Sequence, residues 1–264
     1  MIRFCFVHAF ICILFLSCSD NSGSDSPDPS GENDWDIVIA SSAHQPGIGN
    51  SDGLPNGAPW QLPAGIELVD RPNKPFDPNL NLLHGSLNTF YADVNFINTL
   101  DDTVMVDMPS GLIFLYKHEG RTQNGILTSN VQIAVPPSNT DVIADTTTVY
   151  IGLGCLNYTK AFPWEENQQD DTQYYPIGKD MYTASVVSND ENINQLLDIL
   201  DDYSGLRVTQ HYNPQEMFDE DYETPEWRMI YALIQEALWK ITDGPGLMRG
   251  ERRELLEALE PYRF

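Results

Sequence analysis

Cys155 is the residue of this chain whose type and position first suggest chemistry. It lies in the stretch GLGCLN, behind a β-branched run, and the other three cysteines fall within the first 18 residues. In a chain that begins like an exported protein, such a cysteine has no evident disulfide partner. It is therefore either a small buried hydrophobic residue or a nucleophile, and a nucleophile would need a base close by.

Gln235 is a polar residue on a predicted helix that is apolar over most of its circumference. The sequence of this helix is PEWRMIYALIQEALWKIT. One apolar stripe recurs at helical spacing, and Tyr231, Gln235 and Trp239 lie on the adjoining arc. We therefore expect the Gln235 amide to be buried, where an unpaired polar group costs about 1–3 kcal/mol. The simplest interpretation is a structural glutamine that bonds a loop carbonyl. The stripe consists of Ile230, Ile234, Ala237, Leu238 and Ile241.

The sequence IQEALWKITDG resembles the Gln-x-Ala-x-Trp motif of bacterial thioester domains, which are surface adhesin modules. The order of the cysteine, then helices, then this motif is similar to theirs, and the resemblance covers about residues 89–246. Two positions depart from the family pattern. Ile234 stands where a polar residue usually precedes the glutamine, and Gly154 stands where an aromatic residue usually precedes the cysteine.

The resemblance implies an internal thioester between Cys155 and Gln235, with Trp239 shielding the bond from water. The thiolate would displace ammonia from the carboxamide, and the resulting acyl group could then be attacked by an amine of a partner protein or surface ligand. It also implies an adhesion or binding module that uses no cofactor and is not an enzyme in turnover. The alternatives are a structural or accessory envelope lipoprotein without a reactive bond, and an extracellular cysteine hydrolase.

Other chemical motifs are weak. A hydrolase would need a base for Cys155, and the histidines outside the leader show no family-specific context. Aspartate pairs could offer oxygen ligands to calcium, but no EF-hand spacing appears, and no zinc signature or phosphate loop is present. We therefore predict no metal site. The histidines are His44, His84, His118 and His211, and the aspartates are Asp101/Asp102, Asp170/Asp171, Asp201/Asp202 and the cluster of residues 219–221.

The elements that must position Cys155 and Gln235 are strands first and helices later. From Thr89 to Cys155, short β-branched runs alternate with turn signals such as Asn124-Gly125, which predicts an antiparallel sandwich or barrel. The expected inward residues include Val94, Phe96, Val106, Ile133 and Val135. Helical periodicity then appears in ENINQLLDILDDY, in the Gln235 segment and in ERRELLEALE, so we predict an α+β fold with a helical C-terminal part.

The first residues resemble the signal of a bacterial lipoprotein. Arg3 precedes an apolar run from Phe4 to Leu16, and Cys18 follows that run as the lipidated cysteine of a lipobox would. We interpret residues 1–17 as a signal peptide, residues 18–35 as a flexible acidic tether, and residues 36–88 as a Pro/Gly-rich arm before a module over residues 89–264. The acidic residues behind Cys18 resemble a surface-export signal, which implies an outer-membrane lipoprotein exposed at the cell surface.

The chain is strongly acidic, with a formal net charge of −25. Such a charge opposes binding to nucleic acid, whose backbone is neutralised by Lys and Arg, and it equally opposes direct adsorption to anionic lipid. The expected contact with the membrane is therefore the lipid anchor alone.

The position of Cys18 predicts a lipidated mature N-terminus. Wild-type protein should incorporate a labelled fatty acid in a bacterial host, and Cys18→Ala should abolish that incorporation because no thiol remains to be acylated. Cys155→Ala is the control and should keep the label. A wild-type protein without label would contradict the anchor.

Overall fold

The computed structural model describes residues 33–70, 79–117, 122–139, 145–161, 181–210 and 221–263. These residues belong to one compact unit, Asn33–Phe264. The expected signal peptide, the lipidation residue Cys18 and most of the expected tether lie outside the described residues. No helix within the described ranges has both the length and the apolar content needed to cross a bilayer.

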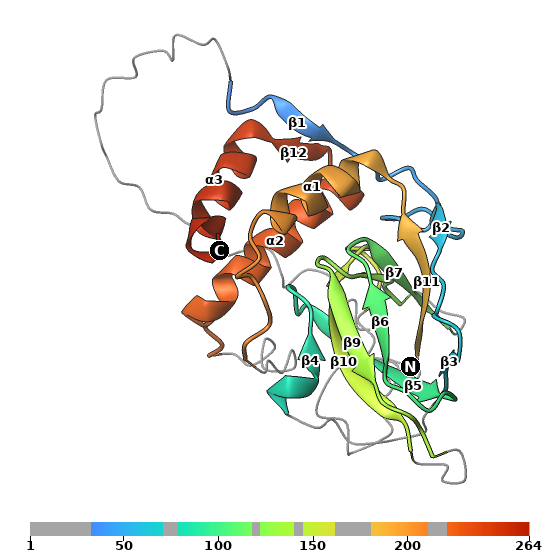
Figure 1. The fold of residues 1–264 in the computed structure, drawn as a ribbon. Coiled ribbons are helices and arrows are strands. Elements are labelled where there is room, and N and C mark those ends of the chain that lie inside the picture. The colour runs from blue at the N-terminus through green and yellow to red at the C-terminus, as the bar shows by residue number, and fades with distance from the viewer. Residues whose placement is uncertain are drawn as a thin grey trace, which may run out of the picture. The chain divides into compact units, whose positions relative to one another are not determined.

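A curled, mostly antiparallel sheet forms the centre of the unit (Figure 1). Its order is β2 (Gly57–Pro59), β11 (Tyr182–Ser188), β7 (Leu112–Tyr116), β8 (Gly125–Ile126), β10 (Thr147–Cys155), β5 (Phe90–Asn98) and β3 (Ile66–Leu68). Strand β4 (Leu83–His84) adds to β10 in parallel. Two further antiparallel pairs are β6 (Val104–Met108) with β9 (Val131–Val135), and β1 (Ile37–Ala40) with β12 (Gly246–Met248).

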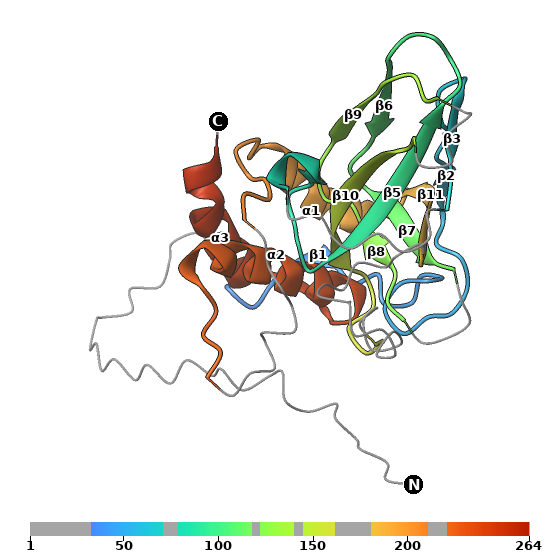
Figure 2. The ribbon, with the colours of Figure 1, turned by 90° about the horizontal axis from the view of Figure 1, so that it is seen from below.

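Three α-helices gather on one side of this sheet, as both ribbon views show (Figures 1 and 2). They are α1 (Glu191–Asp201), α2 (Glu226–Thr242) and α3 (Arg249–Leu259), and short 3-10 turns occur at η1 (Leu80–Leu82) and η4 (Glu260–Tyr262). The predicted α+β class, with strands first and helices mainly late in the chain, is confirmed. The sequence predicts Thr224 as the N-cap of α2 and Pro225 as its first helical residue. In the structure the helix begins one residue later, at Glu226, with Pro225 as its N-cap.

Two apolar cores lie on the two faces of the sheet. One fills the interior of the curl and contains all five residues predicted to point inward, Val94, Phe96, Val106, Ile133 and Val135. The other lies between the sheet and the helices, and the whole predicted stripe of α2 is buried in it. Strand β10 therefore has apolar packing on both of its faces, and its last residue is Cys155.

Apolar residues alternate with Tyr91, Asp93 and Asn95 along the sequence of β5, which predicts a strand with one solvated face. In the structure β5 is buried on both faces. Tyr91, on the face expected to be wet, has no exposed surface and packs with Leu83, Tyr150 and Val208 in a small third cluster. The cover comes from residues near β4 and from the segment after α1, which are far from β5 in sequence. Local alternation therefore could not reveal it.

The sequence of segment 36–88 predicts an extended arm or a set of ordered turns, with a first strand in WDIVIASS. In the structure this segment supplies β1 to β4, and these strands pair with β12, β11, β5 and β10 respectively. Proline is compatible with this because each of these strands is very short and the pairings lie mainly at sheet edges. The segment thus joins the same compact unit as the later strands.

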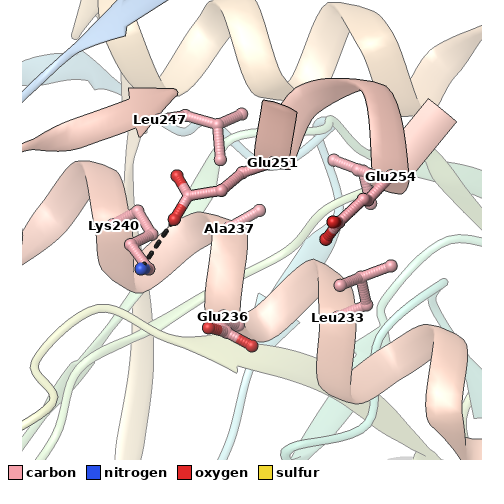
Figure 3. A pocket seen from close by; sticks show the side chains of 8 residues that line it. Leu233, Glu236, Ala237, Lys240, Leu247, Glu251 and Glu254 are labelled. Atoms are coloured by element: carbon pink, nitrogen blue, oxygen red, sulfur yellow. Dashed lines mark ion pairs between the residues drawn. The ribbon is translucent and has the colours of Figure 1, made fainter. Parts of the chain in front are cut away.

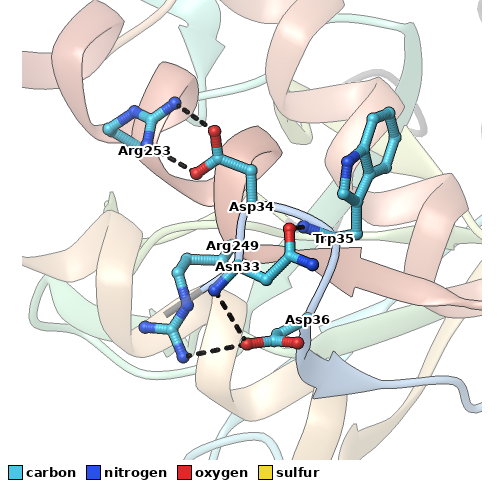
Figure 4. A network of polar contacts seen from close by, with 6 residues as sticks. All are labelled: Asn33, Asp34, Trp35, Asp36, Arg249 and Arg253. Atoms are coloured by element: carbon cyan, nitrogen blue, oxygen red, sulfur yellow. Dashed lines mark hydrogen bonds and ion pairs between the residues drawn. The ribbon is translucent and has the colours of Figure 1, made fainter. Parts of the chain in front are cut away.

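The start of this unit is clamped to α3 by charges and backbone bonds (Figure 4). Arg253 donates two hydrogen bonds to the Asp34 carboxylate, at 2.7 and 3.1 Å, and this contact lowers the pKa of Asp34. The amides of Arg249 and Gly250 donate to the carbonyls of Asp36 and Asp34. Residues 33–36 therefore follow the N-terminal turn of α3 before the chain enters β1.

The same substitution at two methionines of β6 can test which face of this strand is buried. Met108 is fully buried and Met105 is 45% exposed. Met108→Ala should lower the free energy of unfolding by about 2–5 kcal/mol, because it leaves a cavity in the core. Met105→Ala, the control, should cost less than about 1 kcal/mol. Chemical denaturation of both variants measures the difference, and equal costs would contradict the inward assignment of Met108.

Candidate functional site

Cys155 lies where the pairing of β10 changes partner. The ladder between β10 and β5 ends at Leu153 opposite Phe90, while the last two residues of β10 pair with β8 on the other side. In an antiparallel ladder, successive residues direct their backbone polar groups to alternate sides. Leu153 bonds toward β5 through the Thr89 amide, so Cys155 also directs its N–H and C=O to that side. Because β5 begins at Phe90, it has no residue opposite Cys155.

The side-chain amide of Gln235 occupies this vacated position. The Cys155 N–H donates to Gln235 Oε1 at 2.8 Å, and Gln235 Nε2 donates to the Cys155 carbonyl at 3.0 Å. The glutamine thus pairs with the strand end as a neighbouring strand would. Gln235 is only 4% exposed, so the expectation of a buried amide is met, and its partner is the backbone of Cys155 itself.

Thr89 supplies a third bond to the same amide. Its hydroxyl donates to Gln235 Oε1 at 2.6 Å, so this one carbonyl oxygen accepts from both Thr89 Oγ and Cys155 N. All three residues are buried. Hydrogen bonds of this kind are stronger away from water, so the Gln235 carbonyl is held in one orientation and polarised.

Two glycines let the flanking segments close on β10. A methyl group at Gly154 would lie 2.7 Å from Leu87 Cδ2, 3.0 Å from Leu238 Cδ2 and 3.5 Å from Gln235 Oε1. At Gly152 it would lie 2.3 Å from the Leu87 carbonyl oxygen. Gly154, which stands where the thioester-domain pattern has an aromatic residue, is therefore the position that gives α2 and its glutamine close access to the strand.

Trp239 lies one turn after Gln235 on α2 and packs against the apolar cluster that includes Cys155. Its ring meets Tyr158 edge to face, with 4.8 Å between ring centroids. Its indole N–H is buried and has no hydrogen-bond partner among the described residues. The structure thus brings the three residues predicted to act together, Cys155, Gln235 and Trp239, into one region.

Asp243 gives this region its charge. One carboxylate oxygen accepts from Thr242 Oγ at 2.7 Å, and the backbone of Tyr158 bonds the same carboxylate. Burial raises the pKa of Asp243, although these hydrogen bonds oppose the shift. Burial, and secondly the charge of Asp243, raise the pKa of the Cys155 thiol well above its usual value. The thiol is therefore protonated at neutral pH.

Thr89, Tyr158 and Asp243 were not singled out from the sequence. In the sequence, Thr89 marks only the start of a predicted strand, and Asp243 is the polar residue that ends the predicted helix and is expected to face water. Neither position carries a local signal, because each acquires its role through contact with residues far along the chain. Cys18, the expected lipidation site, lies outside the described residues.

The described histidines offer little to a hydrolase. His84 is paired with Ile151 on β10, four residues before Cys155, which is roughly 13 Å along an extended strand. Neither His44 nor His84 hydrogen-bonds Cys155 within the described part of the chain, and His118 and His211 lie outside it. Cys155 itself is fully buried.

Metal-binding groups do not converge in the described ranges, where no three His, Cys, Asp or Glu side chains are placed to hold an ion.

A small pocket of about 50 Å³ lies between α2 and α3 and is bordered by the Lys240–Glu251 ion pair at 2.7 Å (Figure 3). Ligand sites usually measure roughly 300–1,000 Å³, so this pocket is too small for an organic ligand.

Comparisons of this chain with protein-family models, with curated proteins and with solved structures returned no match. The chemistry of the Cys155 region therefore has to be inferred from its own geometry.

The position of Asp243 predicts how Cys155 titrates when its thiol is free. In Gln235→Ala protein, the pH dependence of iodoacetamide alkylation should give a thiol pKa above the ordinary range. Adding Asp243→Asn removes a negative charge that opposes thiolate formation, so the profile should move to lower pH. Glu236→Gln, on the exposed face of α2, is the control and should leave the profile in place. An unmoved profile in the Asp243 variant would show that its charge does not reach the thiol.

Proposed function

We propose that this protein is a lipid-anchored cell-surface binding module in which Cys155 and Gln235 form an internal thioester that captures a partner amine. The observation that carries the proposal is the double hydrogen bond between the Gln235 amide and the Cys155 backbone. It places the acyl group of one residue against the main chain of the other, although 80 residues separate them. Forming such a bond depends on positioning of this kind.

The orientation of the amide suits attack by the thiol. Because the amide pairs edge to edge with the backbone of Cys155, its plane follows that of the sheet. Strand side chains stand roughly perpendicular to the sheet, so the Cys155 side chain leaves the amide plane. A nucleophile approaches a carbonyl carbon from above or below that plane. An approach by Sγ would therefore meet one face of the Gln235 amide.

The reaction balances without a cofactor. The Sγ–Cδ bond forms, the Cδ–Nε2 bond breaks, and ammonia leaves with the proton of the thiol. A partner's primary amine then attacks Cδ, and the Cδ–Sγ bond breaks. The thiol regains a proton from the amine, and the product is an amide that links the partner to Gln235. Trp239 and the surrounding apolar cluster would keep water from the thioester before the amine arrives.

A cysteine hydrolase fits this site less well. Catalytic cysteines are accessible and have a lowered pKa, whereas Cys155 is fully buried and its pKa is raised. The other alternative, an envelope lipoprotein without a reactive bond, would use the same hydrogen bonds only to hold α2 against β10. Mass spectrometry separates that alternative from the proposal.

The thioester predicts a covalent link between two distant peptides. Proteolysis of the wild-type mature protein at mildly acidic pH should yield the Cys155 and Gln235 peptides joined, with a mass one ammonia below their sum. Treatment with methylamine before digestion should separate them, add one methylamine-derived amide at Gln235 and free the thiol for alkylation.

Cys155→Ala is the control for this experiment, and it should give an unmodified Gln235 peptide that does not take up methylamine. Unlinked peptides and an alkylatable Cys155 in the wild-type protein would overturn the thioester and leave the structural envelope lipoprotein as the function.

A further inference from the structure

Gln235 Oε1 is the most heavily hydrogen-bonded side-chain atom at the site. It accepts from Thr89 Oγ at 2.6 Å and from Cys155 N at 2.8 Å, and both donors are buried. The carboxamide needs no second donor on its oxygen to be satisfied as a structural group, because Cys155 N already supplies one. The extra donor stands where negative charge would appear if the carbonyl carbon were attacked.

We propose that Thr89 Oγ–H and Cys155 N–H form an oxyanion hole, and that Thr89 is the residue that sets the rates at which the thioester forms and is opened by amines. This inference rests on the thioester proposed above. Both reactions pass through a tetrahedral intermediate in which the carbonyl electron pair moves to Oε1. Two donors already aimed at that oxygen stabilise the charged intermediate more than the neutral carbonyl.

The scaffold holds both donors before any reaction begins. Cys155 N is fixed by the end of β10, and the neighbouring Thr89 N–H donates to the Leu153 carbonyl at 3.1 Å, which fixes the start of β5. A hydroxyl bonded to a carbonyl oxygen must be the donor, since the carbonyl has no hydrogen to give. Groups preset in this way need no rearrangement when charge develops, which is the condition for an effective oxyanion hole.

The oxyanion hole activates the Gln235 carbonyl and does not activate the Cys155 thiol. Burial and Asp243 hold the Cys155 thiol protonated, so the site gains little from thiolate reactivity. Polarising the Gln235 carbonyl is the contribution that the described residues make to lowering the barrier. Thr89 should therefore affect the rate of the reaction more than the structure of the module.

Substitutions at Thr89 test this role. Thr89→Val keeps the shape and removes the donor, and it should slow methylamine opening of the thioester, or thioester formation on refolding, roughly 100- to 1,000-fold. Thr89→Ser restores the hydroxyl and should restore the rate. Thr128→Val is the matched control, because Thr128 is also buried and its hydroxyl bonds Ser86 Oγ at 2.9 Å, away from Gln235. It should lose similar stability without loss of rate.

The outcomes separate the two proposals. If wild-type protein is linked and Thr89→Val reacts as fast as Thr128→Val, the oxyanion hole is wrong and the thioester stands. If the wild-type peptides are never linked, both proposals fail.

A spectroscopic measurement covers the case in which Thr89→Val does not fold. The difference infrared spectrum of folded protein before and after methylamine treatment isolates the thioester carbonyl stretch. In the wild type and in Thr89→Ser, that stretch should lie below the frequency of a simple thioester in an aprotic solvent. An unshifted band would show that the carbonyl receives no such hydrogen bonds.

Discussion

The pairing of one side-chain amide with one strand end is the interaction on which the site depends. The ladder of β10 with β5 stops before Cys155, which leaves a backbone N–H and C=O inside the protein. Buried backbone groups must be paired, and only Gln235 on α2 satisfies these two among the described residues. The position of α2 relative to the sheet is therefore set by polar bonds as well as by apolar packing.

This constraint explains several features around it. Glycine at residues 152 and 154 removes side chains that would hold the helix and the segment before β5 away from the strand. The apolar residues of α2 bury against the helical side of the sheet, while Trp239 packs toward the interior of the curl. The helix thus bridges two cores at the point where β10 ends, and Gln235 lies at that junction. The Lys240–Glu251 ion pair joins the same helix to α3 (Figure 3).

Local patterns predicted the fold class and most of the core. The inward residues of β5, β6 and β9 followed from alternation, and the buried stripe of α2 followed from helical spacing. Patterns failed where cover came from distant residues. Tyr91 was expected to face water because no residue near it in the sequence indicates that Val208 covers it. The composition of the proline-rich segment did not indicate that its short strands would pair with the sheet edges. At the site, Gln235 was conspicuous as a polar residue on an apolar helix, whereas Thr89 could only be recognised once its oxygen was placed 2.6 Å from the glutamine.

If the protein is anchored through its N-terminus as proposed, the clamp at Asn33–Asp36 has a mechanical consequence. Tension entering at Asn33 would load the contacts of residues 33–36 with α3 (Figure 4) and then β1. Tension from a partner bound at Gln235 would arrive along α2 at the start of β12. Because β1 and β12 are antiparallel, these two forces pull from opposite ends of the pair, so its hydrogen bonds are sheared together instead of opened one by one. Force between the N-terminal anchor and a partner bound at Gln235 would thus be transmitted mainly through β1, β12 and α2, and the large sheet would bear little of it.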